Sequence, residues 1–291
     1  MWGNRLKTVI LLASLSGLLL LLGAIFGGQQ GITVAFVMSL MMNFIAYFFS
    51  DRIVLRMYGA KPLDEAQYGW IYDMVRELCR QARIPMPKLW LIDTSVANAF
   101  ATGRSPSHAS VAVTTGILEI LDKNELRGVL AHEISHIANR DILINTIAAT
   151  LATAIGYIAN MIQHAAFYRT TSSDNKKNGT LTIIGALVIS ILMPIAATLI
   201  QLAITRSREY LADETGAHVC KDPLALADAL QKLNDHVHVS HFKKDDSAKA
   251  STAHMFIVNP FTPGMLATLF STHPPMEARI MRLRKIYEEM S

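Results

Sequence analysis

The chain has 291 residues, 51% of them hydrophobic, and its mean hydropathy of +0.29 is high for a soluble protein. This composition points to membrane segments, and the length allows one large or two small domains. The net charge of +4 suits a protein close to anionic lipid. Because no basic patch interleaves with aromatic residues, we expect no nucleic-acid partner. Two cysteines without a CxxC partner, Cys79 and Cys220, fit buried thiols in a reducing compartment.

Four apolar runs are candidates for membrane-spanning helices. Thr8 to Phe26 and Ile32 to Phe49 are separated by a short glycine-rich stretch and predict a transmembrane hairpin. A cleaved signal peptide is the alternative for the first run, but its apolar stretch is too long and no A-x-A-like site follows it. Ile142 to Phe167 and Leu181 to Thr205 contain polar residues, so we expect these two spans to face protein more than lipid. Buried core helices of a soluble domain are the alternative for this second pair.

The lysines and arginines next to these runs predict the orientation. If all four runs span the bilayer, the basic residues at their inner ends share one side, which should be the cytoplasm. Those residues are Arg5, Lys7, Arg52, Arg56, Lys61, Arg140, Arg206 and Arg208. The loop after the third run also carries basic residues, which count against this topology.

Between the hairpin and the third run, the pattern changes to that of a mixed α and β domain. Asp64 to Arg83 has the apolar spacing of an amphipathic helix. Lys88 to Ile92, Ala97 to Thr102 and Ser110 to Thr114 then predict short strands. We expect a small sheet, whose edge could hold an extended peptide as an additional strand.

The most specific motif lies on the next predicted helix, whose start is marked by the capping-box-like pair Asp122 and Glu125. His132 and His136 are one helical turn apart and can offer two imidazole nitrogens to one metal ion. Glu133 lies beside that face, close enough to take a proton from a water without being a ligand. Neutral imidazoles and an open position suit catalytic zinc. The alternative is a helix whose histidines and glutamate simply face solvent.

Such a site needs a third protein ligand, and Glu209 is the best candidate. Asp213 lies four residues further on the same predicted helical face, where it could hydrogen-bond a ligating imidazole. A carboxylate ligand would also offset part of the charge of a divalent ion. A charged surface helix is the alternative for this stretch.

Together these motifs resemble a family of membrane metallopeptidases that includes bacterial HtpX and the eukaryotic prenyl-protein (CaaX) protease. The resemblance also includes Asn98 to Gly103 before the motif and Thr272 to Pro275 after it, and with the apolar runs it covers nearly the whole chain. It implies one Zn²⁺ per chain, bound by His132, His136 and Glu209, with Glu133 as general base.

The fold class that follows is an α-helical membrane protein with four transmembrane helices and an α+β, gluzincin-like zinc protease domain containing a small sheet. We expect a transmembrane hairpin at 1–50 and a cytoplasmic catalytic part at 51–141. A second pair of membrane helices at 142–205 precedes a cytoplasmic part at 206–291, which carries the third ligand.

The resemblance and the helix geometry disagree about which residue supports the ligands after the motif. The family usually has an aspartate where this chain has Asp141. On a regular helix, however, Asp141 lies about 180° from His132, whereas Asn139 shares the ligand face. Both therefore stand as candidate partners of the metal ligands.

The remaining candidates concern substrate. By resemblance, Asn98, Ala99 and Phe100 belong to the strand edge that holds a peptide. His273 could donate to the oxyanion formed when water attacks a peptide carbonyl, and Arg279 could be the donor or a substrate clamp. From the sequence alone, both would be read as structural residues.

The resemblance implies a zinc endopeptidase in the bacterial inner membrane, with several spans and an active site facing the cytoplasm. Its partners would be the lipid bilayer and misfolded or damaged membrane proteins, or peptides, as in quality control under stress. One alternative is processing of a defined modified peptide. Another is a non-catalytic scaffold braced by zinc, although a structural site has no use for a base such as Glu133. The oligomeric state is left open.

Overall fold

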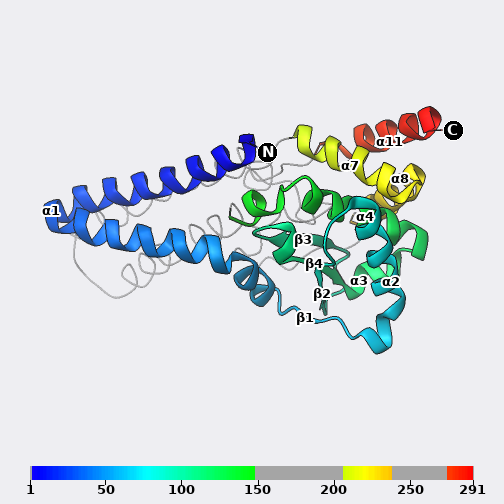
Figure 1. Ribbon diagram of the computed structural model, residues 1–291, viewed down its shortest axis with the longest axis horizontal. Coiled ribbons are helices and arrows are strands. Elements are labelled where there is room, and N and C mark those ends of the chain that lie inside the picture. Colours follow the sequence, from blue (N-terminus) through cyan, green and yellow to red (C-terminus); the bar gives the residue numbers. More distant parts are fainter. Residues whose placement is uncertain (1, 148–205, 238–273, 291) are drawn as a thin grey trace, which may run out of the picture.

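The computed structural model describes residues 2–147, 206–237 and 274–290, and Figure 1 shows two parts with different shapes. A helical hairpin, α1 (Trp2–Met57), extends away from the rest of the protein and reverses at Gly28 (φ 54°, ψ −139°). Its two arms are joined by a hydrogen bond that Asn43 Nδ2 donates to Ser16 Oγ over 2.9 Å. The first two apolar runs therefore form a helical hairpin, and its insertion in a membrane stays a prediction.

Only part of the predicted membrane architecture can be compared with the structure. Within the described residues, one helical segment, Gly28–Met57, is long and apolar enough to cross a membrane by length and composition. Large apolar side chains are exposed along it, among them Phe36, Leu40 and Phe44. The third run begins as a helix at 142–147, and its remainder and the fourth run lie outside the described residues. Four spans therefore remain a prediction.

The small sheet is mixed, with strand order β1-β2-β4-β3. Its strands are β1 (Lys61–Pro62), β2 (Lys88–Ile92), β3 (Ala99–Gly103) and β4 (Ala109–Thr114). β2 and β4 are parallel, while β1 and β3 pair antiparallel at the two ends of this order. Three strands were predicted to within two residues. The two-residue β1 carries too few residues to show a strand pattern.

Two helices beside the sheet have capped N-termini, and the cap of α4 is the one that the sequence predicted. α2 (Glu65–Ala82) is capped by Asp64, and α4 (Lys123–Ala138) has a complete capping box formed by Asp122 and Glu125. A short 3₁₀ turn, η1 (Pro106–His108), precedes β4, and the short α3 (Thr115–Ile120) follows it. The C-terminal part supplies α7 (Arg206–Cys220), α8 (Pro223–Val237) and α11 (Met276–Met290).

The helix α4 lies at the centre of the main core. It packs against α2, α7, α8 and strand β3, so residues before and after the undescribed stretch share one apolar cluster. Two glycines allow close helix packing: a Cβ on Gly128 would lie 2.5 Å from the Leu226 nitrogen, and one on Gly216 would lie 3.1 Å from the His132 nitrogen. The opposite face of the sheet, including Phe100, packs against the end of α1.

Candidate metal centre

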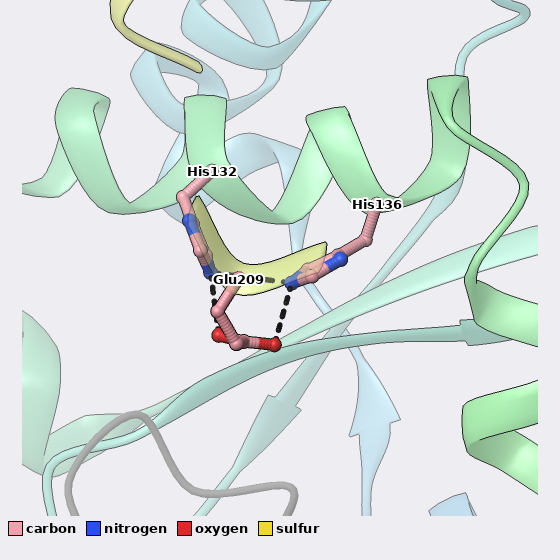
Figure 2. A group of neighbouring side chains, drawn as sticks. All are labelled: His132, His136 and Glu209. Carbon is pink, nitrogen blue, oxygen red and sulfur yellow. Dashed lines mark hydrogen bonds and ion pairs between the residues drawn. The ribbon is translucent and has the colours of Figure 1, made fainter. Parts of the chain in front are cut away.

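Three side chains from two helices converge on one point. α4 places His132 and His136 one turn apart, and α7 brings Glu209 opposite them, as Figure 2 shows. The two Nε2 atoms are 3.2 Å apart. Glu209 Oε2 lies 3.7 Å from Nε2 of His132, and Oε1 lies 3.6 Å from Nε2 of His136. All three residues are buried.

These separations fit one metal ion. Donors around a tetrahedral zinc with bonds of about 2.1 Å are about 3.4 Å apart, close to the three distances observed. Two imidazoles and one carboxylate are also a donor set found in catalytic zinc proteins, where the fourth position takes water or substrate. The described residues thus offer three suitable ligands and an accompanying base.

The second ring nitrogen of His132 is held by a buried ion pair. Its Nδ1 lies 2.9 Å from Oδ1 of Asp213. Arg279 donates to both oxygens of that carboxylate, from Nη2 to Oδ1 over 2.7 Å and from Nε to Oδ2 over 2.9 Å. Burial alone would raise the pKa of Asp213, but Arg279 and His132 hold it well below its usual range. Asp213 therefore stays ionised and fixes the His132 ring with Nε2 directed at the site.

His136 is held from the other side by Asp141, whose Oδ2 lies 3.4 Å from its Nδ1. The regular-helix argument against Asp141 does not hold, because α4 ends at Ala138 and Arg140 adopts a left-handed conformation (φ 61°). The chain turns back, and the Asp141 nitrogen donates to the His136 carbonyl over 2.9 Å. Asn139 is the C-cap of the helix, and no contact with a ligand is found for its side chain among the described residues.

The electrostatics of the site favour a cation at these histidines. Burial alone would lower the pKa of His136. The hydrogen bond with Asp141 and the charges of Glu209 and Glu133 outweigh that effect and raise the pKa to about 9. A position that stabilises a proton so strongly also stabilises a metal ion, which competes for the same imidazole.

The candidate base lies between the metal ligands and the sheet. Glu133 is buried, and its Oε2 accepts a hydrogen bond from the Ala101 backbone nitrogen of β3 over 2.8 Å. This contact joins the helix that carries two ligands to the strand predicted to bind peptide. It also fixes the orientation of the Glu133 carboxylate.

Three of the other substrate candidates occupy or adjoin β3, and a fourth lies on α11. Ala99 and Phe100 are buried in the strand, and Asn98 is buried just before it. Asn98, Phe100 and Thr114 help to line a cavity of about 290 Å³ on the α1 side of the sheet. Arg279 is fully buried, with Nη2 3.5 Å from His132 Nε2. His273 lies outside the described residues.

Comparison with known proteins decides the family. The sequence profile of peptidase family M48 matches residues 65–287, a stretch that contains all three candidate ligands and Glu133. The chain belongs to peptidase family M48. This membership makes it a metalloprotease and confirms the enzyme class and the family predicted from the motifs.

Relatives of this M48 peptidase match along almost its full length. A "Protease HtpX homolog" from Sulfurihydrogenibium sp. is 50% identical and covers 99% of this chain and 97% of its own. A homologue of the same description from Syntrophobacter fumaroxidans is 52% identical and covers 98% of this chain and 100% of its own. One from Pyrococcus furiosus is 51% identical and covers 99% of this chain and 98% of its own. The crystal structure of Ste24p from S. mikatae has a similar fold, with a TM-score of 0.51 and 16% identity, covering 96% of this chain and 65% of that one.

Sequence reasoning missed one feature of this centre. Arg208 lies next to the ligand Glu209 and is 9% exposed, with Nη1 3.5 Å from Asp141 Oδ1. Its position after an apolar run suggested a charge at a membrane boundary, and its place in the family-like motif Ser207-Arg208 was given no chemical role. The proximity of Arg208 to a candidate ligand was the one signal that could have indicated another role.

Proposed function

We propose that this M48 peptidase is a zinc-dependent endopeptidase anchored in the inner membrane, which hydrolyses misfolded or damaged membrane proteins at the cytoplasmic face. One observation carries the catalytic part of the proposal: Glu133 lies beside the group His132, His136 and Glu209 and is hydrogen-bonded to the sheet. A structural metal site would have no use for such a base.

The chemistry follows from this arrangement. A zinc ion held by His132, His136 and Glu209 would polarise a peptide carbonyl and lower the pKa of the attacking water. Glu133 accepts the proton of that water and passes it to the leaving amine. Because Ala101 holds Oε2 of Glu133, the other carboxylate oxygen remains for this proton transfer.

The backbone of β3 supports the proposed mode of peptide binding. The Thr114 nitrogen donates to the Asn98 carbonyl. In this antiparallel ladder the even-numbered residues of β3 therefore direct their backbone N–H and C=O groups towards β4. The odd-numbered residues then direct their backbone groups to the opposite side, as the contact from Ala101 to Glu133 requires. A substrate strand would pair with this outer edge of β3 through backbone groups other than the Ala101 and Gly103 nitrogens, which donate to Glu133 and Thr146, and its carbonyl groups would come near the base.

Arg279 supports stabilisation of the oxyanion. Among the described residues its Nη1 is buried without a hydrogen-bond partner, while its other nitrogens hold Asp213. A free guanidinium N–H next to the metal ligands can donate to the oxygen on which negative charge develops. His273 remains a second candidate donor, predicted from sequence alone.

The exposed apolar arm of α1 supports anchoring in a membrane. The Asp141 carboxylate, which contacts His136, immediately precedes the third apolar run, so the site would lie near the bilayer surface. Membrane proteins would then be the accessible substrates, and the distribution of basic residues favours the cytoplasmic side.

Two substitutions test this function in the full-length protein. Glu133→Gln should keep zinc but reduce cleavage of an unfolded membrane protein by about 10²- to 10⁴-fold, the usual contribution of general-base catalysis. Glu209→Ala should lose both zinc and activity, and Glu119→Gln, an exposed change on α3, is the control. Retained cleavage by Glu133→Gln would exclude it as the base, and unchanged zinc in Glu209→Ala would place the third ligand elsewhere.

A further inference from the structure

Arg208 is a buried cation that the proposed chemistry does not use. It is 9% exposed, and its guanidinium lies beside the Asp141 carboxylate. Placing a guanidinium in the interior is costly unless a charged partner compensates it. The carboxylate of Asp141, 3.5 Å from Nη1, is such a partner.

The surroundings of Arg208 repeat those of Arg279. On one side of the centre, Arg279 contacts Asp213, which contacts the Nδ1 atom of His132. On the other side the same three residue types occur in the same order. Arg208 contacts Oδ1 of Asp141, whose Oδ2 faces Nδ1 of His136. Each ligating imidazole is therefore backed by an aspartate and an arginine.

We propose that Arg208 is a positioning residue of the metal centre. It holds Asp141 so that this carboxylate keeps the His136 imidazole directed at the metal. The inference rests on the metal-dependent function proposed above. Asp141 follows the end of α4, and Arg208 reaches its carboxylate from α7, so this contact ties the carboxylate to the helix that carries Glu209.

The charges of the described site support this role. Four carboxylates and two guanidinium groups are buried there: Glu133, Asp141, Glu209 and Asp213, with Arg208 and Arg279. The four negative and two positive charges leave two negative charges, which one divalent cation with two neutral imidazoles would balance. Without Arg208, an additional negative charge would stay in the interior, where an uncompensated charge is expensive.

The competing explanation is that Arg208 only fastens α7 to its neighbours. A fastening residue affects stability without altering the environment of the metal. Arg127 provides a matched control, because it also joins α4 to α7, donating to the Cys220 carbonyl over 2.7 Å. Arg127 contacts Glu77 as well, and within the part of the chain that the structure describes no hydrogen bond or ion pair joins it to either ligand histidine.

The test uses the full-length protein in lipid nanodiscs, with Arg208→Gln, Arg208→Lys and the control Arg127→Gln. Zinc affinity is measured by competition with a chromogenic chelator, and the visible spectrum of the Co²⁺-substituted protein reports the ligand geometry. We expect Arg208→Gln to weaken zinc binding about 10- to 100-fold and to change the Co²⁺ bands. Arg208→Lys keeps the charge and should recover part of the affinity, and Arg127→Gln should match the wild type in both measurements.

Combining Arg208→Gln with Asp141→Asn tests whether the arginine acts through the aspartate. The double variant should bind zinc no more weakly than Asp141→Asn alone, and additive losses would contradict the proposed route. Wild-type affinity and spectrum in folded Arg208→Gln would overturn the inference. If that variant does not fold, Arg208→Lys decides by the same two measurements. A wild-type chain that binds no zinc through His132 and His136 would instead refute the proposed function.

Discussion

Replacing Asp213 with asparagine removes the charge of this side chain while nearly keeping its shape. Asp213 and Arg279 both have 0% exposed side chains, and two hydrogen bonds of 2.7 and 2.9 Å join them. An asparagine that keeps its oxygen towards His132 and Arg279 Nη2 must turn its NH₂ group towards Arg279 Nε, so two donors face each other. Arg279 then remains as a buried cation with only part of its partner.

The size of the effect follows from this burial. Removing one partner of a fully buried ion pair costs about 3–5 kcal/mol of folding free energy. Zinc binding should weaken less, by about tenfold, because an asparagine oxygen can keep the place of Asp213 Oδ1, 2.9 Å from His132 Nδ1, and complete loss of such a partner typically costs 10–100-fold. Asp213→Asn is therefore expected to affect stability more than metal affinity.

Chemical unfolding of the full-length protein in detergent measures the first quantity, and chelator competition measures the second. The double variant Asp213→Asn with Arg279→Met also removes the stranded cation, and it should recover most of the stability, since apolar replacement of a buried pair is often neutral. The reasoning is refuted if Asp213→Asn unfolds within about 1 kcal/mol of wild type, or if the double variant is less stable than the single one.

Two further outcomes test the packing of the core. Gly128→Ala should destabilise the protein by about 1–3 kcal/mol, because its new Cβ would meet the α8 backbone. Gly69→Ala is the control, since a Cβ there meets nothing within 4 Å and should not destabilise the protein. Equal unfolding curves for the two variants would contradict this account. Burial raises the pKa of Cys79 to about 11, so maleimide at pH 8 should label this thiol only after the protein unfolds. Peptide mass spectrometry measures the labelling. Rapid labelling of the native protein would mean that the thiol is accessible.

Local signals in the sequence were sufficient for the elements that carry their own caps. The pair Asp122 and Glu125 predicted the start of α4, and the structure contains the hydrogen bonds of this cap and of the Asp64 cap of α2. These caps act over three residues or fewer, so they depend little on the rest of the fold. The ligand spacing within α4 followed from the same regular geometry.

The geometry was not predictable where the chain leaves the regular helix. Arg140 has a positive φ, which is uncommon for a residue other than glycine and leaves no sequence signal. This turn brings Asp141 to His136 and removes the helical argument for Asn139. Arg208 was likewise predicted to be a flanking charge, because burial beside Asp141 depends on how α7 packs.

The metal centre is assembled from distant parts of the chain. His132 and His136 come from α4, Glu209 from α7, and Arg279, which holds Asp213, from α11. α7 can bring its carboxylates this close because a side chain at Gly216 would press on the α4 backbone at His132. The motif on α4 therefore offers two candidate ligands and a candidate base, but their orientation requires the C-terminal helices. Proteolytic competence and the packing of α7 and α11 on α4 should consequently be gained or lost together.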